Sequence, residues 1–283
     1  MSRPLSQVQL LRELQPDIER NLARLTAATD DLHPGDHLPA VGATPVPTAA
    51  RSAMITSFLT TPVTPAFLGR TGHRVPENPW STWLDSWTAA KNGHIAFLRE
   101  HLVIGAGVDA TALDRARANT MPVGIDSSLE GANLLHWVAH VTLQEMAAAV
   151  LHRNAAQLCG PTPTGKGLAR IAEADNLHMR FYRDMCGAAF ELAPDQTIKS
   201  VADVVMNFQM PGSTIPGIRH HTSLVVEHRI YDRRHHADDV VGPVLQHWNI
   251  FERNDLTAAG ERARDRIATF VDASRCSLPA TVA

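Results

Sequence analysis

The sequence predicts an all-α protein built as a bundle of long helices, and three observations lead to this prediction. Apolar residues recur at helical intervals from the N-terminus onward, as Leu10, Leu14 and Ile18 do. No stretch alternates apolar and polar residues over the length of a strand. The segment 129–154 is hydrophobic on several sides, which is typical of a helix at the centre of a bundle.

The N-terminal part of the chain predicts three helices. The leucine pattern places the first at 7–26, and the Pro- and Gly-rich segment 31–50 is expected to be an irregular connection. A second helix is expected at 49–59, ended by the prolines that follow it. A third, at 80–104, carries Leu84, Trp87 and Leu98 on one stripe.

The rest of the chain predicts a shorter helix around Leu113 and then longer ones. The loop CGPTPTGKG separates the helix at 129–154 from the next. The remaining expected helices, each bounded by turn-forming residues, cover residues 168–185, 195–208, 239–251 and 256–272. We expect residues 1–283 to form a single domain, with 276–283 as a disordered tail.

Composition restricts the partners and the compartment. The net charge of −3 leaves no basic footprint, so nucleic acid is not an expected partner. The three cysteines lack the spacing of a zinc site or a disulfide framework, which favours a reducing compartment. The N-terminus has no signal-peptide pattern and no apolar run is long enough to span a bilayer, so we expect a cytoplasmic protein without a membrane partner.

Ionisable residues interrupt the buried stripes of three predicted helices. Asp175 and His178 lie three positions apart on the stripe of helix 168–185, Lys91 and His94 lie similarly on 80–104, and Glu145 lies on 129–154. Burying a charge is costly without a partner, so the five residues predict one polar site inside the bundle. In the structural alternative, Lys91 pairs with Glu145 or Asp175 only to fix how the helices align.

Several ordered segments carry a family resemblance. They include SWTAAKNGH, VTLQEMAAAVLHRN, ADNLHMRFYRD, NFQMPGSTIPG and YDRRHHADDVVGPVLQHWNIFER. Through these segments the chain resembles the soluble acyl-[acyl-carrier-protein] desaturases, in particular the actinobacterial branch, from about Leu10 to Phe270. The resemblance implies a ferritin-like helix bundle with additional helices, a dimer, a di-iron centre and an acyl chain delivered by an acyl carrier protein.

The iron ligands that the resemblance implies are only partly present. The family supplies a Glu, an E-x-x-H pair, a second Glu and a second E-x-x-H pair. The corresponding positions here are Thr61, Lys91 with His94, Glu145, and Asp175 with His178. An ammonium group thus stands where a bridging carboxylate belongs, beside the positions of two cations, and this change is expected to abolish at least one iron position.

Two further positions depart from the family. The residue that the resemblance links to oxygen activation is Ala148 rather than Thr, and the residue linked to electron delivery is Ala174 rather than Asp. Together with Lys91 they argue against ordinary oxygen-dependent desaturation.

Three functional hypotheses follow. In the first, no cofactor is bound, and Lys91 and His94 perform acid–base chemistry on a carrier-linked substrate while Glu145, Asp175 and His178 orient them. Proton transfer, elimination or cyclisation are the reactions that such a cluster favours. In the second, Glu145, Asp175, His178 and His94 bind one divalent ion such as iron, manganese or zinc. In the third, the protein is a non-catalytic scaffold that binds a carrier protein, with an identical or a different subunit as its dimer partner.

Overall fold

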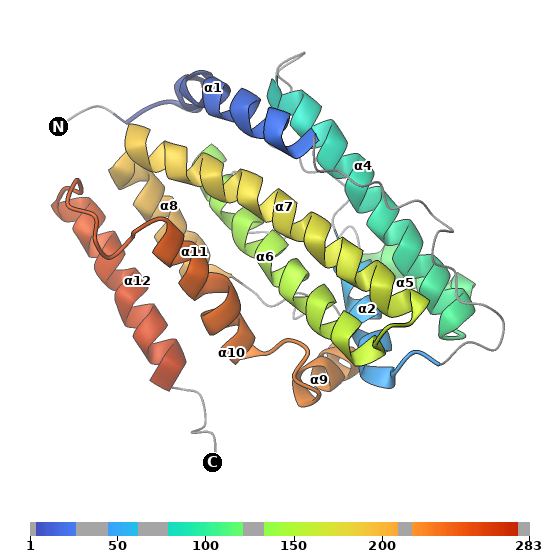
Figure 1. Ribbon diagram of the computed structural model, residues 1–283. Coiled ribbons are helices and arrows are strands. Elements are labelled where there is room, and N and C mark those ends of the chain that lie inside the picture. Colours follow the sequence, from blue (N-terminus) through green and yellow to red (C-terminus); the bar gives the residue numbers. More distant parts are fainter. Residues whose placement is uncertain (1–3, 27–44, 62–78, 121–132, 209–216, 277–283) are drawn as a thin grey trace.

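All regular structure in the residues that the computed structural model describes, 4–26, 45–61, 79–120, 133–208 and 217–276, is helical (Figure 1). The predicted all-α class is therefore confirmed. Four helices form the central bundle: α2 (Thr48–Thr60), α4 (Pro79–Glu100), α6 (Leu134–Cys159) and α7 (Pro163–Leu192). Helices α6 and α7 run side by side along their length in Figure 1 and form the most extensive helix pair.

Further helices cover this bundle from several sides. Helix α1 packs on α7 and α4, α8 packs on α6, α12 packs on α8, and α9 packs on α2. The bounds of these and the other elements are α1 Gln7–Thr26, η1 His101–Gly105, α5 Ala110–Thr120, α8 Pro194–Asn207, α9 Arg219–Glu227, α10 Arg233–His235, η3 His236–Val241, α11 Gly242–His247 and α12 Ala258–Cys276.

The connection between α6 and α7 is shorter than expected, and the prediction of a loop over CGPTPTGKG was wrong. Helix α6 continues past Asn154, and Gly160 ends it with a φ of 65°. The Thr162 hydroxyl then caps α7, which begins at the following proline. Gly167 lies within α7, where α4 comes so close that a Cβ would collide with the ring of Phe97, so this position needs glycine for close packing rather than for a turn.

Other predicted bounds also needed correction. The segment 31–50 is not irregular to its end, since α2 begins at Thr48, and residues 27–44 lie outside the described ranges. Helix α9 was not predicted. The expected helix at 239–251 is instead three short pieces from Arg233 to His247, because a π-helix interrupts it and Asn249 takes a φ of 50° after it ends. The predicted disordered tail falls on residues 277–283, outside the described ranges, apart from Cys276, which ends α12.

A dense aromatic group fills the bundle between α4, α6 and α7. The rings of Trp83 and Phe181 stack with their centroids 3.8 Å apart, and Trp87 and Trp137 meet Tyr182 edge to face. The expectation that no apolar run is long enough to span a bilayer was wrong, because α6 is long and apolar enough by length and composition, but 78% of its most apolar window is buried. That burial is what a core helix requires.

Candidate active site

Three helices bring the five predicted polar residues into one interior cluster. Helix α4 carries Lys91 and His94, α6 carries Glu145, and α7 carries Asp175 and His178. All five side chains are buried. The stripes that the sequence pattern predicted therefore do face a common core, and we refer to these five residues as the Lys91 cluster.

Lys91 bridges the two carboxylates of the cluster. Its Nζ lies 2.6 Å from Oε2 of Glu145 and 2.7 Å from Oδ1 of Asp175. The second oxygen of Glu145 accepts a hydrogen bond of 3.0 Å from Nε1 of Trp87. The two negatively charged carboxylates thus share one ammonium group, which lies between them, so that each buried charge has a partner of opposite sign.

This geometry keeps all three groups ionised. Burial acts to lower the pKa of Lys91, but the charges of Asp175 and Glu145 outweigh it and raise the pKa above its ordinary value. Burial acts to raise the pKa of Asp175, yet Lys91 and the hydrogen bond from His152 hold it well below the ordinary value. The pKa of Glu145 is likewise lowered against the effect of burial, mainly by Lys91.

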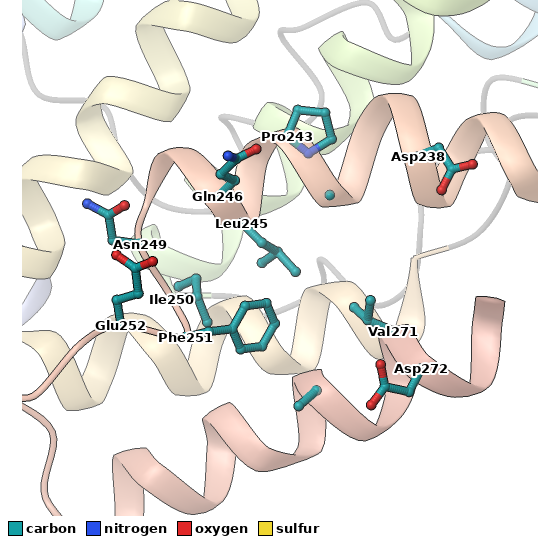
Figure 2. A pocket seen from close by; sticks show the side chains of 12 residues that line it. Asp238, Pro243, Leu245, Gln246, Asn249, Ile250, Phe251, Glu252, Val271 and Asp272 are labelled. Atoms are coloured by element: carbon teal, nitrogen blue, oxygen red, sulfur yellow. The ribbon is translucent and has the colours of Figure 1, made fainter. Parts of the chain in front are cut away.

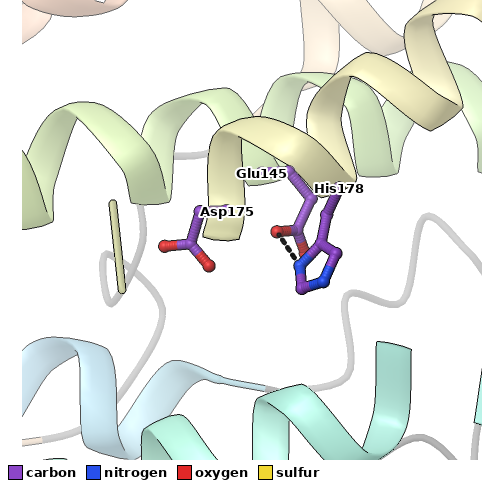
Figure 3. A group of neighbouring side chains, drawn as sticks. All are labelled: Glu145, Asp175 and His178. Atoms are coloured by element: carbon purple, nitrogen blue, oxygen red, sulfur yellow. Dashed lines mark ion pairs between the residues drawn. The ribbon is translucent and has the colours of Figure 1, made fainter. Parts of the chain in front are cut away.

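The two cluster histidines flank this ion-paired centre. Nδ1 of His94 lies 3.4 Å from Oδ1 of Asp175, and Nδ1 of His178 lies 3.5 Å from Oε2 of Glu145. Figure 3 shows Asp175 and His178 extending from α7 into the same interior, with the His178 ring next to Glu145. Burial lowers the pKa of His94, so its imidazole is neutral at pH 7.

Sequence reasoning missed two members of the polar network. Nδ1 of His152 lies 2.7 Å from Oδ2 of Asp175, and its Nε2 lies 2.7 Å from Oγ of Ser57 on α2. His152 shares the predicted stripe of Glu145, two turns along α6, so its position could have been recognised as part of the site. Ser57 carried no comparable signal, because α2 is buried on most sides and lacks a distinct polar face.

The cluster also contains potential metal ligands. Glu145, Asp175 and His178 place one ligand atom each within 4.8 Å of one another. In the described part of the chain they form the one set of at least three His, Cys, Asp or Glu residues that could hold a metal ion. Thr61, which the resemblance places at the position of a Glu ligand, donates its hydroxyl to the carbonyl of Ser57 at 2.8 Å.

Two cavities in the described part of the chain have linings made by other residues than the cluster's. One, of about 560 Å³, is lined by residues of η3, α11 and α12 together with the turn after α11, including Leu245, Phe251 and Val271 (Figure 2). The other, of about 490 Å³, lies between α6 and α7 and is lined by Met146, Arg153 and Lys166 among others. None of the five cluster side chains lines either cavity.

Replacing His94 by glutamine is expected to flatten the dependence of stability on pH between 7 and 5. The unfolded chain binds a proton at His94 near the ordinary pKa of about 6.5, whereas the folded protein binds it only at lower pH. The unfolded state therefore binds more protons, and stability falls as the pH drops through this range. In the parent, His94 should therefore contribute up to about 1.4 kcal/mol per pH unit to the decrease in the free energy of unfolding, and the variant should lack this contribution. Urea unfolding at several pH values measures the difference.

The matched control is His228→Gln, which changes an exposed histidine at the end of α9 and should leave the profile as it is in the parent. An unchanged slope in His94→Gln would contradict the neutral, buried state of His94.

Comparison with known proteins agrees with the resemblance carried by the sequence segments. The family model described as fatty acid desaturase matches residues 61–276. The acyl-[acyl-carrier-protein] desaturase DesA1 of Mycobacterium tuberculosis is 32% identical over 96% of this chain and 87% of its own length. The chloroplastic stearoyl-[acyl-carrier-protein] 9-desaturase 1 of Arabidopsis thaliana is 27% identical over 72% of this chain, which spans about half of that longer protein (52%).

A solved structure supports the fold. The X-ray structure of the acyl-ACP desaturase DesA2 of Mycobacterium tuberculosis superposes with a TM-score of 0.70, covering 90% of this chain and 98% of that one at 18% identity. The expected ferritin-like helix bundle is thereby confirmed.

Proposed function

The chain belongs to the acyl-[acyl-carrier-protein] desaturase family, and we propose that it acts on a carrier-linked acyl substrate through a metal-free acid–base site. The observation that carries this proposal is the position of Lys91. Its ammonium group lies between the carboxylates of Glu145 and Asp175, at 2.6 and 2.7 Å. The substrate class follows from the names of the relatives, which act on substrates bound to acyl carrier protein.

The donor set does not fit a di-iron centre. Iron in such sites depends on carboxylate oxygens, and here one ammonium group is hydrogen-bonded to an oxygen of each carboxylate in the cluster. The position of the family's first Glu is Thr61, whose hydroxyl is used in a backbone hydrogen bond. Replacing a carboxylate by an ammonium shifts the local charge by two units toward positive, which opposes cation binding.

The remaining groups suit proton transfer. His94 is buried and neutral at pH 7, so one of its ring nitrogens can accept a proton from a substrate atom. Lys91 is held as an ammonium and can stabilise negative charge that develops nearby. Asp175 orients both, because the same Oδ1 lies near Lys91 and His94. These roles favour proton transfer, elimination or cyclisation over oxidation.

A second candidate function is carrier-protein binding without catalysis. It is favoured by the closed pairing of the Lys91 cluster, and by the fact that none of its five side chains lines either cavity. In either role we propose that residues 1–283 act as one domain within a dimer. A site with one metal ion on Glu145, Asp175 and His178 would require Lys91 to leave the oxygens that it now occupies.

The test is incubation of the protein with acyl-acyl carrier protein, followed by intact-mass measurement of the carrier and by chromatography of the acyl chain released from it, because proton transfer and cyclisation leave the mass unchanged. We expect the protein to bind the acyl carrier, and any product to form equally well without oxygen and in the presence of a chelator. The variant His94→Ala should lose the product but keep binding, whereas Arg12→Ala, a change on the exposed face of α1, should behave like the parent.

Three outcomes separate the hypotheses. A product lighter by two hydrogens that forms only with iron, oxygen and a reductant would overturn the metal-free proposal. Binding with no change in either the mass or the chromatographic retention of the acyl chain would favour the scaffold. Absence of carrier binding would contradict both.

A further inference from the structure

Three side chains at the edge of the Lys91 cluster form an ordered hydrogen-bonded chain. We propose that Ser57, His152 and Asp175 act as nucleophile, general base and orienting acid in acyl transfer from a carrier-protein thioester. The thioester as substrate rests on the proposed function, whereas the assignment of the three residues rests on their geometry alone. The proposed reaction is therefore cleavage of the thioester through an acyl-enzyme intermediate.

The atoms connect in the order that this chemistry requires. Oγ of Ser57 lies 2.7 Å from Nε2 of His152, and Nδ1 of the same ring lies 2.7 Å from Oδ2 of Asp175. This is the arrangement in which a hydroxyl, a base and an acid activate a nucleophile on unrelated folds. With Nδ1 donating to Asp175, Nε2 is free to accept the hydroxyl proton.

The three residues come from three different helices, α2, α6 and α7. Asp175 is held in place from its other side, since Oδ1 accepts a hydrogen bond of 2.7 Å from Lys91. The oxygen that faces His152 is therefore fixed in direction, and the imidazole is fixed between two partners. Such preorganisation is what a nucleophilic site needs from its supporting residues.

A second serine–histidine pair on α2 lacks these features and provides a matched control. Oγ of Ser52 lies 3.1 Å from Nδ1 of His221, so the contact uses the other ring nitrogen. Among the described residues, the charged groups that act on His221 are His220 and Arg51, and no carboxylate is among them. The two serines lie five positions apart on one buried helix, yet only Ser57 is connected through histidine to an acid.

The proposed reaction balances without a redox partner. Oγ of Ser57 attacks the thioester carbonyl carbon while its proton passes to Nε2 of His152. The carbon–sulfur bond breaks, and the leaving thiolate takes that proton to become the carrier thiol. Water then attacks the serine ester with the same base, which releases the free acid and restores Ser57, so that thioester and water become acid and thiol.

The first experiment treats the full-length protein with a biotinylated fluorophosphonate and maps the modified residue by peptide mass spectrometry. We expect modification of Ser57, loss of it in Ser57→Ala, and unchanged modification in Ser52→Ala. His152→Gln should slow modification at least about 100-fold, the scale expected for loss of a general base. Circular dichroism of each variant establishes that it is folded, and Ser57→Cys provides a folded nucleophile variant if Ser57→Ala unfolds.

The second experiment measures release of free thiol from palmitoyl-acyl carrier protein, alongside binding of the same carrier. Thiol release that depends on Ser57 and not on Ser52 supports the proposal. The proposal is overturned if Ser57 stays unmodified in the parent, or if parent and Ser57→Ala release thiol equally. Either result overturns it even when the carrier still binds. Modification of Ser57 without carrier binding would instead refute the proposed substrate class and leave the nucleophile assignment standing.

Discussion

Replacing Lys91 by methionine is expected to lower the free energy of unfolding by about 3–5 kcal/mol, the scale found when one partner of a buried ion pair is removed. Lys91 Nζ is within 2.7 Å of oxygens of both Glu145 and Asp175, and these carboxylates are at most 3% exposed. Methionine keeps most of the side-chain volume but leaves two buried negative charges beside one another. Urea unfolding at pH 7 measures the change.

The size of this loss depends on charge rather than on packing, and further variants separate the two causes. Adding Glu145→Gln and Asp175→Asn to Lys91→Met removes the unpaired charges, so the triple variant should recover part of the lost stability. Arg12→Ala removes one member of an exposed ion pair and should change stability by no more than about 0.5 kcal/mol. A loss below about 1 kcal/mol in Lys91→Met would show that the bridge contributes little to the fold.

Replacing Lys91 by glutamate is expected to create a divalent-cation site where the metal-free proposal expects the parent to hold no stoichiometric metal. The change turns one positive charge into a negative one next to Glu145, Asp175 and His178, whose ligand atoms already lie within 4.8 Å of one another. At an effective dielectric constant of 20, each pair of unit charges 4 Å apart contributes about 4 kcal/mol. Affinity for Fe²⁺ or Mn²⁺ should therefore rise at least about 100-fold.

Elemental analysis after expression with iron, manganese and zinc, followed by dialysis, measures the metal content of parent and variant. The matched control is Lys166→Glu, the same change at an exposed lysine of the α6–α7 cavity, which should acquire no tightly bound metal. About two iron ions per chain in the parent would overturn the metal-free proposal, and about one would support the single-ion alternative.

The central helices and their buried faces were predictable because helical periodicity determines which side chains share a face. The stripes through Lys91, Glu145 and Asp175 were each recognised within a single helix, and the structure places all three in one interior. The same signal failed where helices are short or interrupted, as between Arg233 and His247, since a π-helix shifts the face from one turn to the next.

The connection between α6 and α7 shows a second limit. A run of Gly and Pro is typical of a loop, but Gly167 lies within α7, and glycine is needed there because Phe97 of α4 occupies the space of a side chain. This need comes from a contact between segments 70 positions apart, so local sequence does not reveal it.

By itself, then, the sequence determined that a buried lysine faces two carboxylates and two histidines inside a helix bundle of the desaturase family. Only the tertiary structure decided that Lys91 bridges both carboxylates, and that Asp175 continues through His152 to Ser57. The physical reason is that periodicity sets the direction of a side chain around its own helix axis. The rotation and axial offset of neighbouring helices, which select the atoms that meet, come from packing across the whole core.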